Sequence, residues 1–205
     1  MIVRGLFVWC VMLFVISISD GQAPAKSPVT STKSKSRKEK RMIAEIVTSL
    51  GTIEAELYEA DAPKTVANFA GLAEQKYFDG IIFHRVAKGF VIQGGDPTGT
   101  GRGGKSIYGG EFADELNPQT KSYQEGYKRG VLAMANRGPN TNTSQFFIIL
   151  NDSPSLPKNY SIFGKVTKGM DVVDKIGAVE LVPPGAGDGR PKVDVIMKTV
   201  TVKKQ

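Results

Sequence analysis

The sequence predicts a mainly β domain, in which an antiparallel sheet closes on itself as a barrel with helices over its ends. Three observations favour this fold class. Many short β-like runs follow residue 41, loops rich in Gly, Pro and Asn separate them, and helical periodicity occurs at only two isolated places. This order lacks the regular alternation of strands and helices that indicates a parallel sheet. The 205 residues are enough for one such domain, and a second would be cramped.

A hairpin is expected to open the domain. Residues 43–47 (IAEIV) and 52–58 (TIEAELY) have the composition and alternation of strands, and Leu50 and Gly51 supply the turn between them. The apolar residues of the second run share one face: Ile53, Ala55 and Leu57. We therefore expect that face to contact the core.

Two helices are expected in the domain. Asp61 is predicted to cap the first, and Pro63 fits its first turn, where the missing N–H of proline removes no hydrogen bond. Its apolar residues recur with helical spacing and form one stripe: Val66, Phe69, Ala70 and Ala73. The second helix fits residues 170–176, and Gly177 is predicted to end it.

The rest of the sheet is expected to consist of short apolar runs bounded by turn residues. They are residues 81–86 (IIFHRV), 89–95 (GFVIQGG), 130–136 (GVLAMAN), 144–150 (SQFFIIL), 160–166 (YSIFGKV) and 193–202 (VDVIMKTVTV). Because few helices separate these runs, we expect neighbouring strands to be antiparallel.

The first 21 residues are predicted to be a secretory signal peptide. Arg4 gives a positive start, residues 6–16 are apolar, and small residues precede a cleavage site before Gln22. An uncleaved membrane anchor is the alternative, although about 11 to 14 apolar residues fall short of the roughly 20 that span a bilayer. The single cysteine, Cys10, lies in this segment, so the cleaved chain would hold no disulfide.

Residues 22–41 are predicted to be a basic, disordered linker. They carry seven basic residues and one acidic residue, whereas residues 42–205 carry 19 basic and 18 acidic residues. Most of the net charge of +7 therefore belongs to the linker, and the folded domain gives no indication of a nucleic-acid partner. A contact of the linker with anionic lipid or cell-wall polymer is the alternative to a solvated spacer. Membrane contact is expected only through the N-terminal segment, if that segment stays uncleaved.

Residues 99–106 (GTGRGGKS) match the phosphate-binding pattern G-x-x-x-x-G-K-[ST]. Such a loop must lead from a strand into a helix, because the helix N-terminus binds the phosphate. Here Gly109 and Gly110 follow closely and would break a helix in its first turns. We therefore interpret the match as a glycine-rich surface loop and expect no nucleotide hydrolysis.

The side chains that usually carry covalent or metal chemistry are scarce in this sequence. His84 is the only histidine, and no cysteine would remain after cleavage of the signal peptide. This excludes a Cys-His nucleophile and a multi-histidine metal site, and we expect neither a metal nor a cofactor. Reactions that need only positioning and electrostatic stabilisation stay open.

Two motifs place polar side chains at the edges of apolar strands: FHRVAKGFVIQGGD at 83–96 and MANRGPNTNTSQFF at 134–147. Buried polar residues often only satisfy backbone groups. Together with FGKV at 163–166, however, these motifs resemble the cyclophilin family of peptidyl-prolyl cis–trans isomerases, over roughly residues 43–202. The resemblance implies an eight-stranded antiparallel β-barrel closed by two α-helices.

The resemblance also implies a reaction, rotation about the amide bond that precedes proline. The barrier is about 18–20 kcal/mol because resonance makes the C–N bond partly double. Twisting the bond returns a lone pair to the proline nitrogen, so a donor aimed at that atom stabilises the twisted state more than the planar states. By resemblance Arg85 is the catalytic donor, and Gln93 orders it and contacts the substrate backbone.

The remaining site residues are assigned by the same resemblance. Ala135 and Asn136 belong to the substrate-binding residues, and Asn136 would bind the backbone of the residue before proline through its main chain. An apolar pocket would hold the proline ring and remove the amide from water. Its residues would be Phe90, Val91, Phe147 and Leu156, with Tyr160 beside them.

The sequence departs from the best-known family pattern in several places. Ser155 stands where many relatives carry a tryptophan that contacts cyclosporin, so weak cyclosporin binding is expected. Tyr160 stands where many carry a histidine and is similar to bacterial-type members. Arg137 replaces a residue that is often small, so the peptide preference is expected to lean acidic. The segment 121–129 (KSYQEGYKR) is longer than the corresponding segment of typical relatives, and we assign it no role.

The expected function is therefore that of an exported, monomeric peptidyl-prolyl isomerase that assists the folding of other exported proteins. Its partners would be proline-containing polypeptides. A non-catalytic chaperone or adhesion module of the same fold is the alternative, and the presence of both Arg85 and Gln93 favours catalysis. The periplasm, the cell exterior and a secretory lumen all stay open, and glycosylation sequons at Asn142 and Asn159 matter only in the last.

Overall fold

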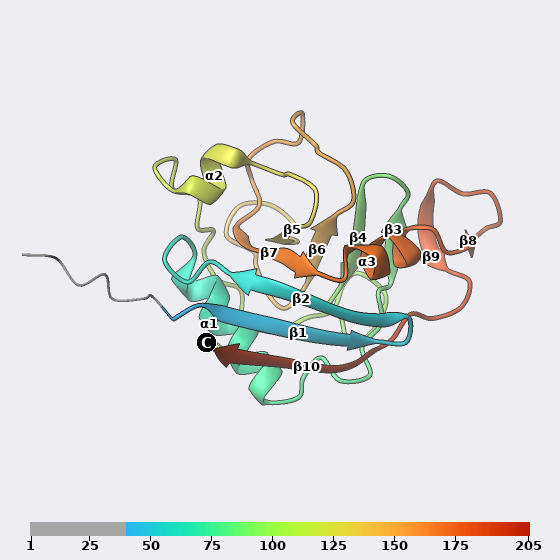
Figure 1. Ribbon diagram of the computed structural model, residues 1–205, viewed down its shortest axis with the longest axis horizontal. Helices are drawn as coiled ribbons and strands as arrows, with labels where there is room; N and C mark the ends of the chain where they lie inside the picture. The colour runs from blue at the N-terminus through green and yellow to red at the C-terminus, as the bar shows by residue number, and fades with distance from the viewer. Residues whose placement is uncertain (1–39) are drawn as a thin grey trace, which may run out of the picture. The chain divides into compact units, whose positions relative to one another are not determined.

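The computed structural model describes residues 40–205. The predicted signal peptide, 1–21, and all but the last two residues of the predicted linker, 22–41, lie outside the described residues. The strands are β1 (Met42–Thr48), β2 (Gly51–Leu57), β3 (Arg85–Ala87), β4 (Val91–Gly94), β5 (Val131–Met134), β6 (Phe146–Ile149), β7 (Ile162–Lys168), β8 (Leu181–Val182), β9 (Asp188–Pro191) and β10 (Met197–Lys204). The helices are α1 (Pro63–Glu74), α2 (Lys121–Glu125) and α3 (Met170–Gly177) (Figure 1).

The sheet is antiparallel throughout, with the strand order β10-β1-β2-β7-β5-β6-β4-β3-β9-β8. β1 lies between β2 and β10, and these three long strands run side by side (Figure 1). Alternate residues of β1 and β2 are buried, because successive side chains of a strand point to opposite faces. The mainly β, antiparallel prediction and the predicted hairpin are therefore confirmed.

The structure corrects the expected number of strands and helices. Residues 40–205 form ten strands in place of the expected eight, because β8 and β9 are short segments in a region rich in Gly and Pro that carries no strand pattern. A third helix, α2, forms in the segment 121–129, to which no role was assigned. The predicted strand at 81–86 shortens to β3, and α3 extends one residue further than expected to include Gly177.

Closure of the barrel stays a prediction, because the strand order has two ends, at β10 and at β8. One isolated bridge joins Ile82 to Ile196. Around it, the N–H of Phe83 donates to the carbonyl of Val195 (2.9 Å) and the N–H of Met197 donates to the carbonyl of Ile81 (2.8 Å). These bonds connect the segment before β3 to the segment that leads into β10.

The helix α1 packs its predicted stripe against the sheet. Val66, Phe69 and Ala73 are buried, and Ala70 packs against the same core from its edge. Phe69 lies within 5.0–5.5 Å, between ring centroids, of three further buried rings. They are Phe78, Phe146 and Phe163. The core of the domain therefore lies between α1 and the inner face of the sheet.

The predicted cap of α1 by Asp61 is wrong. Ala62 occupies the N-cap position and has no capping side chain. The carboxylate of Glu115 instead accepts hydrogen bonds from the N–H groups of Lys64 (3.0 Å) and Thr65 (2.8 Å). A carboxylate at a helix N-terminus satisfies unpaired N–H groups and the helix dipole wherever in the chain it originates, so the cap comes from a distant residue.

The glycine-rich loop 99–106 is organised by one buried carboxylate. Asp96, which is 1% exposed, accepts hydrogen bonds from the backbone N–H groups of Thr98, Thr100, Gly101 and Gly103 at 2.6–3.2 Å. No helix follows this loop before α2 in the described chain. The loop therefore lacks the helix N-terminus that a phosphate-binding loop requires.

Candidate active site

A pocket of about 240 Å³ opens on the side of the sheet formed by β3, β4 and β6. Its lining consists of Arg85, Phe90, Val91, Gln93, Ala135, Asn136, Phe147, Leu156 and Tyr160. These are the nine site residues predicted from the sequence, and the structure brings all of them together. They come from three strands, from the turn between β3 and β4, which holds Phe90, and from the loops after β5 and β6, so they converge only in the folded chain.

The wall of the pocket is apolar. Val91 and Phe147 are buried, at 2% and 6% exposure, and Phe90, Ala135, Leu156 and Tyr160 pack against the same apolar cluster. The rings of Phe147 and Tyr160 meet edge to face, with centroids 5.4 Å apart, in a favourable aromatic geometry. A pocket of this size and lining suits a small apolar ring.

Arg85 holds its guanidinium at the rim of this pocket. Its Nε and Nη2 donate to the two carboxylate oxygens of Asp188 at 2.9 and 2.5 Å, and its Nη1 donates to Oε1 of Gln93 at 3.1 Å. Three of the five N–H groups are thus used. One N–H on each Nη nitrogen has no partner within the described residues and is available to a ligand.

Gln93 belongs to a chain of hydrogen bonds that ends at Arg85. Its Nε2 donates to Oε1 of Gln145 (2.9 Å), and Nε2 of Gln145 donates to the carbonyl of Gly103 (2.7 Å). Gly103 also donates its N–H to Asp96. The orientation of the Gln93 amide, and through it that of Arg85, is therefore tied to the glycine-rich loop.

Asp188 is a site residue that the sequence did not indicate. It lies in β9, whose residues Asp188 and Gly189 pair with Ala87 and Val86 of β3, and it is 103 positions from Arg85. The arginine and aspartate side chains are 39% and 50% exposed, so the pair contributes little to stability. Its two parallel hydrogen bonds fix the plane of the guanidinium.

Asn136 uses its side chain to hold the loop after β5. Its Nδ2 donates to the carbonyl of Asn159 (2.9 Å), and its Oδ1 accepts from the N–H of Gly138 (3.3 Å). The side chain is therefore engaged within the protein. This arrangement fits the expectation that Asn136 binds a ligand through its main chain.

Arg137, next to Asn136, forms an ion pair on the surface. Its Nη2 donates to Oε1 of Glu111 at 2.7 Å, and its Nη1 donates to the carbonyl of Arg102 at 3.1 Å. Glu111 thus neutralises the charge from which an acidic peptide preference was expected.

His84 precedes Arg85 but lies in the core. It is 7% exposed, and neither ring nitrogen has a hydrogen-bond partner within the described residues. Burial lowers its pKa and outweighs the opposing attraction of Asp96, so the ring is neutral at pH 7. His84 is therefore a packing residue. Within residues 40–205 no group of three or more metal-binding side chains forms a candidate metal site.

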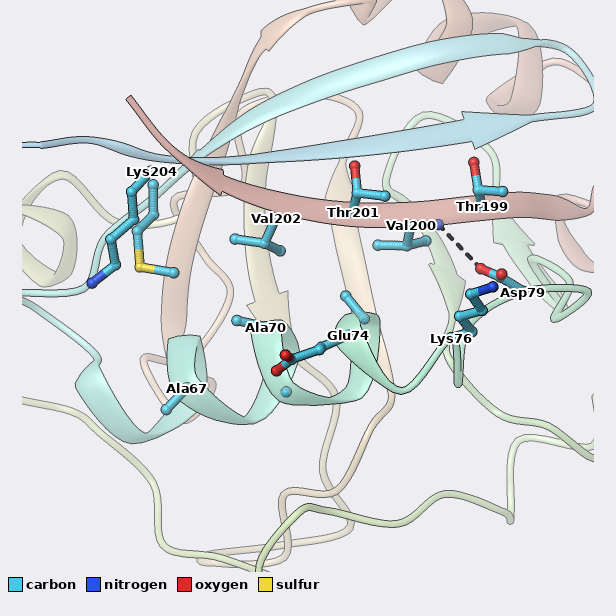
Figure 2. Close-up of a pocket in the computed structure, with 13 residues that line it drawn as sticks. Ala67, Ala70, Glu74, Lys76, Asp79, Thr199, Val200, Thr201, Val202 and Lys204 are labelled. Atoms are coloured by element: carbon cyan, nitrogen blue, oxygen red, sulfur yellow. Dashed lines mark hydrogen bonds between the residues drawn. The ribbon is translucent and has the colours of Figure 1, made fainter.

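A larger hollow, of about 690 Å³, lies between α1 and β10 (Figure 2). Small and aliphatic residues such as Ala70 and Val202 line it, and Glu74, Lys76 and Lys204 carry opposing charges around them (Figure 2). Asp79 there accepts a hydrogen bond from the N–H of Val200. None of the predicted site residues borders it, so the smaller pocket beside Arg85 is the candidate active site.

Comparison with known proteins agrees with the geometry of this pocket. Residues 43–202 match the family model described as cyclophilin type peptidyl-prolyl cis-trans isomerase. Peptidyl-prolyl cis-trans isomerase-like 1 of Neurospora crassa is 50% identical over 161 residues, which cover 78% of this chain and 94% of that protein. Peptidyl-prolyl cis-trans isomerase CYP18-2 of Arabidopsis thaliana is 50% identical over 133 residues, or 65% and 79% of the two chains.

Solved structures are similar as well. The crystal structure of a cyclophilin type peptidyl-prolyl cis-trans isomerase of Cryptosporidium parvum has a TM-score of 0.72 and 38% sequence identity. The match covers 80% of this chain and 99% of the C. parvum chain. A second crystal structure of that protein, in the presence of the dipeptide Ala-Pro, has a TM-score of 0.71 at the same identity and coverage.

Proposed function

The chain belongs to the family of cyclophilin-type peptidyl-prolyl cis–trans isomerases, and we propose that it catalyses cis–trans isomerisation of X–Pro bonds at the pocket beside Arg85. The observation that carries the assignment of the site is the convergence of eight lining residues around the oriented guanidinium of the ninth, Arg85. Isomerisation of a chromogenic X–Pro peptide by the purified full chain tests the proposal. A rate no faster than in buffer at micromolar protein would contradict it.

In this mechanism the proline ring occupies the apolar pocket, against Phe147 and Leu156. Burial there removes water that hydrogen-bonds to the planar amide and stabilises it. As the C–N bond twists, the proline nitrogen regains its lone pair, and a free N–H of Arg85 donates to it. Since the planar amide offers no such acceptor, the hydrogen bond stabilises mainly the twisted state and lowers the barrier.

Asp188 has an orienting role in this mechanism, and its replacement tests that role. Asp188→Asn removes the charge and one of the two acceptors, so the guanidinium loses its fixed plane. We expect kcat to fall about tenfold with little change in Tm, since the pair is exposed. The matched control is Asp174→Asn, which breaks the ion pair with Arg129 and should leave kcat unchanged. An unchanged or increased kcat in Asp188→Asn would contradict the orienting role.

The Arg137–Glu111 pair is expected to limit the preference for acidic peptides. Glu111→Gln frees the charge of Arg137, and the preference for a peptide with Glu rather than Lys next to the X–Pro pair should rise about threefold. The ratio of the two kcat/KM values measures this preference. Glu180→Gln, which removes a carboxylate paired with Lys192, is the control. An unchanged ratio would show that Arg137 does not face the peptide.

The biological setting is also a proposal. The apolar N-terminal run and the basic segment after it support export, where a monomeric isomerase without cofactor would assist the folding of other exported proteins. Ser155 in place of tryptophan supports weak binding of cyclosporin. Mass spectrometry of the protein isolated from its native cells tests export: a chain that starts at Gln22 supports it, whereas an intact Met1 in the soluble fraction contradicts it.

Two further points concern the fold and the membrane. The bridge between Ile82 and Ile196 supports the proposal that the sheet closes into a barrel. In residues 40–205 no helix has the length and apolar character needed to cross a bilayer.

A further inference from the structure

The segment 121–129 packs against one wall of the active-site pocket. That wall is the loop between β6 and β7, and it carries two lining residues, Leu156 and Tyr160. In Figure 1, α2 lies beside this loop, which leads into β7. The loop contains no strand or helix of its own between residues 150 and 161, so its position depends on what it packs against.

The hydroxyl of Tyr127 binds both backbone groups of Tyr160, as a neighbouring strand would in a sheet. Its hydroxyl donates to the carbonyl of Tyr160 at 3.0 Å and accepts from the N–H of the same residue at 3.0 Å. Tyr127 is 4% exposed, and burial raises its pKa to about 12 even though the hydrogen bond that it accepts from the N–H of Tyr160 opposes this shift. The hydroxyl therefore stays protonated and can make both hydrogen bonds.

Tyr127 also contacts the pocket through its ring. It belongs to the apolar cluster beneath the pocket, together with Phe147 and Val91. Its ring meets that of Tyr160 at a centroid distance of 6.2 Å, and the ring of Tyr160 in turn meets Phe147 at 5.4 Å. A displacement of Tyr127 would therefore move two rings that line the pocket.

Other contacts join the same two segments. The N–H of Ser153 donates to the carbonyl of Tyr127 (2.9 Å). Lys158 donates from Nζ to the carbonyl of Tyr123 (2.5 Å) and lies 4.5 Å from the centre of its ring, within the range of a cation–π contact. Asp152 accepts from the N–H of Arg129 at 2.8 Å. The loop is thus held near its start, near its end and at the lining residue Tyr160.

The segment is itself anchored to the domain. Thr120 caps α2 by accepting a hydrogen bond from the N–H of Tyr123, and the N–H of Ser122 donates to Asp61 at 3.0 Å. Asp61 precedes α1, so the short helix is connected to the part of the fold that carries the core. The contacts of Tyr127 can therefore transmit a fixed position to the loop.

We propose that residues 121–129 form a brace that fixes the Leu156–Tyr160 wall of the proline pocket, with Tyr127 as its positioning residue. This inference rests on the proposed active site and adds a determinant of substrate binding outside it. The pocket wall contacts the proline ring in the planar and twisted states alike. Loosening it should therefore weaken binding of both, which raises KM and leaves kcat nearly unchanged.

Tyr127→Phe tests the proposal, because it removes both hydrogen bonds and keeps the ring. We expect KM for an X–Pro peptide, measured in the full chain, to rise about fivefold to tenfold, with kcat within about twofold of wild type. Tyr108→Phe is the matched control, since its hydroxyl donates to the carbonyl of Lys64 at 2.9 Å, outside the pocket lining. KM in this control should stay at the wild-type value.

A second variant separates positioning from stability. Tyr160→Ala keeps the backbone groups that the Tyr127 hydroxyl binds but removes the ring that lines the pocket, so Tyr127→Phe should raise KM by less in the Tyr160→Ala background than in wild type. Lys158→Met, which removes the contact with Tyr123, should raise KM in the same direction but by less. A normal KM with a lowered Tm in Tyr127→Phe, or an equal rise in KM in the Tyr160→Ala background, would overturn the proposal. An inactive wild type would instead contradict the proposed function.

Discussion

Arg85→Ala should lower kcat/KM for X–Pro rotation by about 10²–10³-fold, the loss seen when a preorganised donor to a transition state is removed. Among the described residues that line the pocket, Arg85 is the one cationic group. Its contribution is made mainly in the twisted state, so most of the loss should appear in kcat. The assay is the exchange rate of an X–Pro peptide, followed by NMR at several substrate concentrations.

Two further variants serve as controls for the Arg85→Ala prediction. Arg190→Ala removes an arginine from β9 whose partner is Asp194, and it should leave kcat/KM within about twofold of wild type. Arg85→Lys keeps the charge but cannot bind both carboxylate oxygens of Asp188 in one plane, so its activity should fall between those of wild type and Arg85→Ala. Near wild-type activity in Arg85→Ala would refute the proposed mechanism and would leave the pocket as a binding site for proline peptides.

Most of the pocket was predictable because seven of its nine residues lie in two continuous motifs with strong local patterns, 83–96 and 134–147. Val91 and Gln93 are two residues apart on β4 and share one face, and Phe147 pairs with Gln93 from the neighbouring strand β6, so the strand periodicity alone places these three side chains on known faces. The resemblance to the family then supplied the roles. Tyr160 and Leu156 were harder to place from pattern, since they lie in a loop whose course is set by tertiary contacts.

Partners supplied from distant parts of the chain could not be predicted. Glu115 caps α1 from 50 positions away, and Asp188 reaches Arg85 only because β9 pairs with β3. A surface carboxylate in a Gly- and Pro-rich segment has no periodicity that identifies its partner. The Asp61 cap was a reasonable local expectation, but the helix begins at Pro63 with Ala62 as its N-cap, and a more remote carboxylate reached the free N–H groups.

Tyr127 illustrates the same limit. It lies in a segment that matches no common pattern, and its role depends on a hydroxyl placed between the N–H and C=O of one residue 33 positions away. Sequence spacing carries no information on such a contact. The sequence shows that this segment is longer than in typical relatives, whereas the proposed role as a brace follows only from the folded structure.

Asp96→Asn should lower the free energy of unfolding by about 2–4 kcal/mol at pH 7. Burial alone would raise the pKa of Asp96, but hydrogen bonds from Thr98, Gly103 and Gly101 outweigh it and lower the pKa to about 2. An asparagine offers one acceptor oxygen, and its NH₂ group would face N–H donors of the loop. Urea unfolding monitored by circular dichroism measures the free energy of unfolding. The exposed Asp171→Asn is the control and is expected to match wild type.

The pH dependence of this loss has a definite sign. The folded pKa of about 2 lies below the ordinary value of 3.8, so the stabilisation by Asp96 is fully present above about pH 5 and is lost as the pH falls toward 2. In Asp96→Asn this part of the acid destabilisation should be missing. Because Asp96 binds Gly103, whose carbonyl accepts from Gln145 and so connects to Gln93 and Arg85, the variant should also lose part of its kcat. If the free energy of unfolding depends on pH in the same way in wild type and Asp96→Asn between pH 5 and 2, the buried carboxylate does not stabilise the loop. An unchanged kcat would show that it does not support the catalytic arginine through that loop.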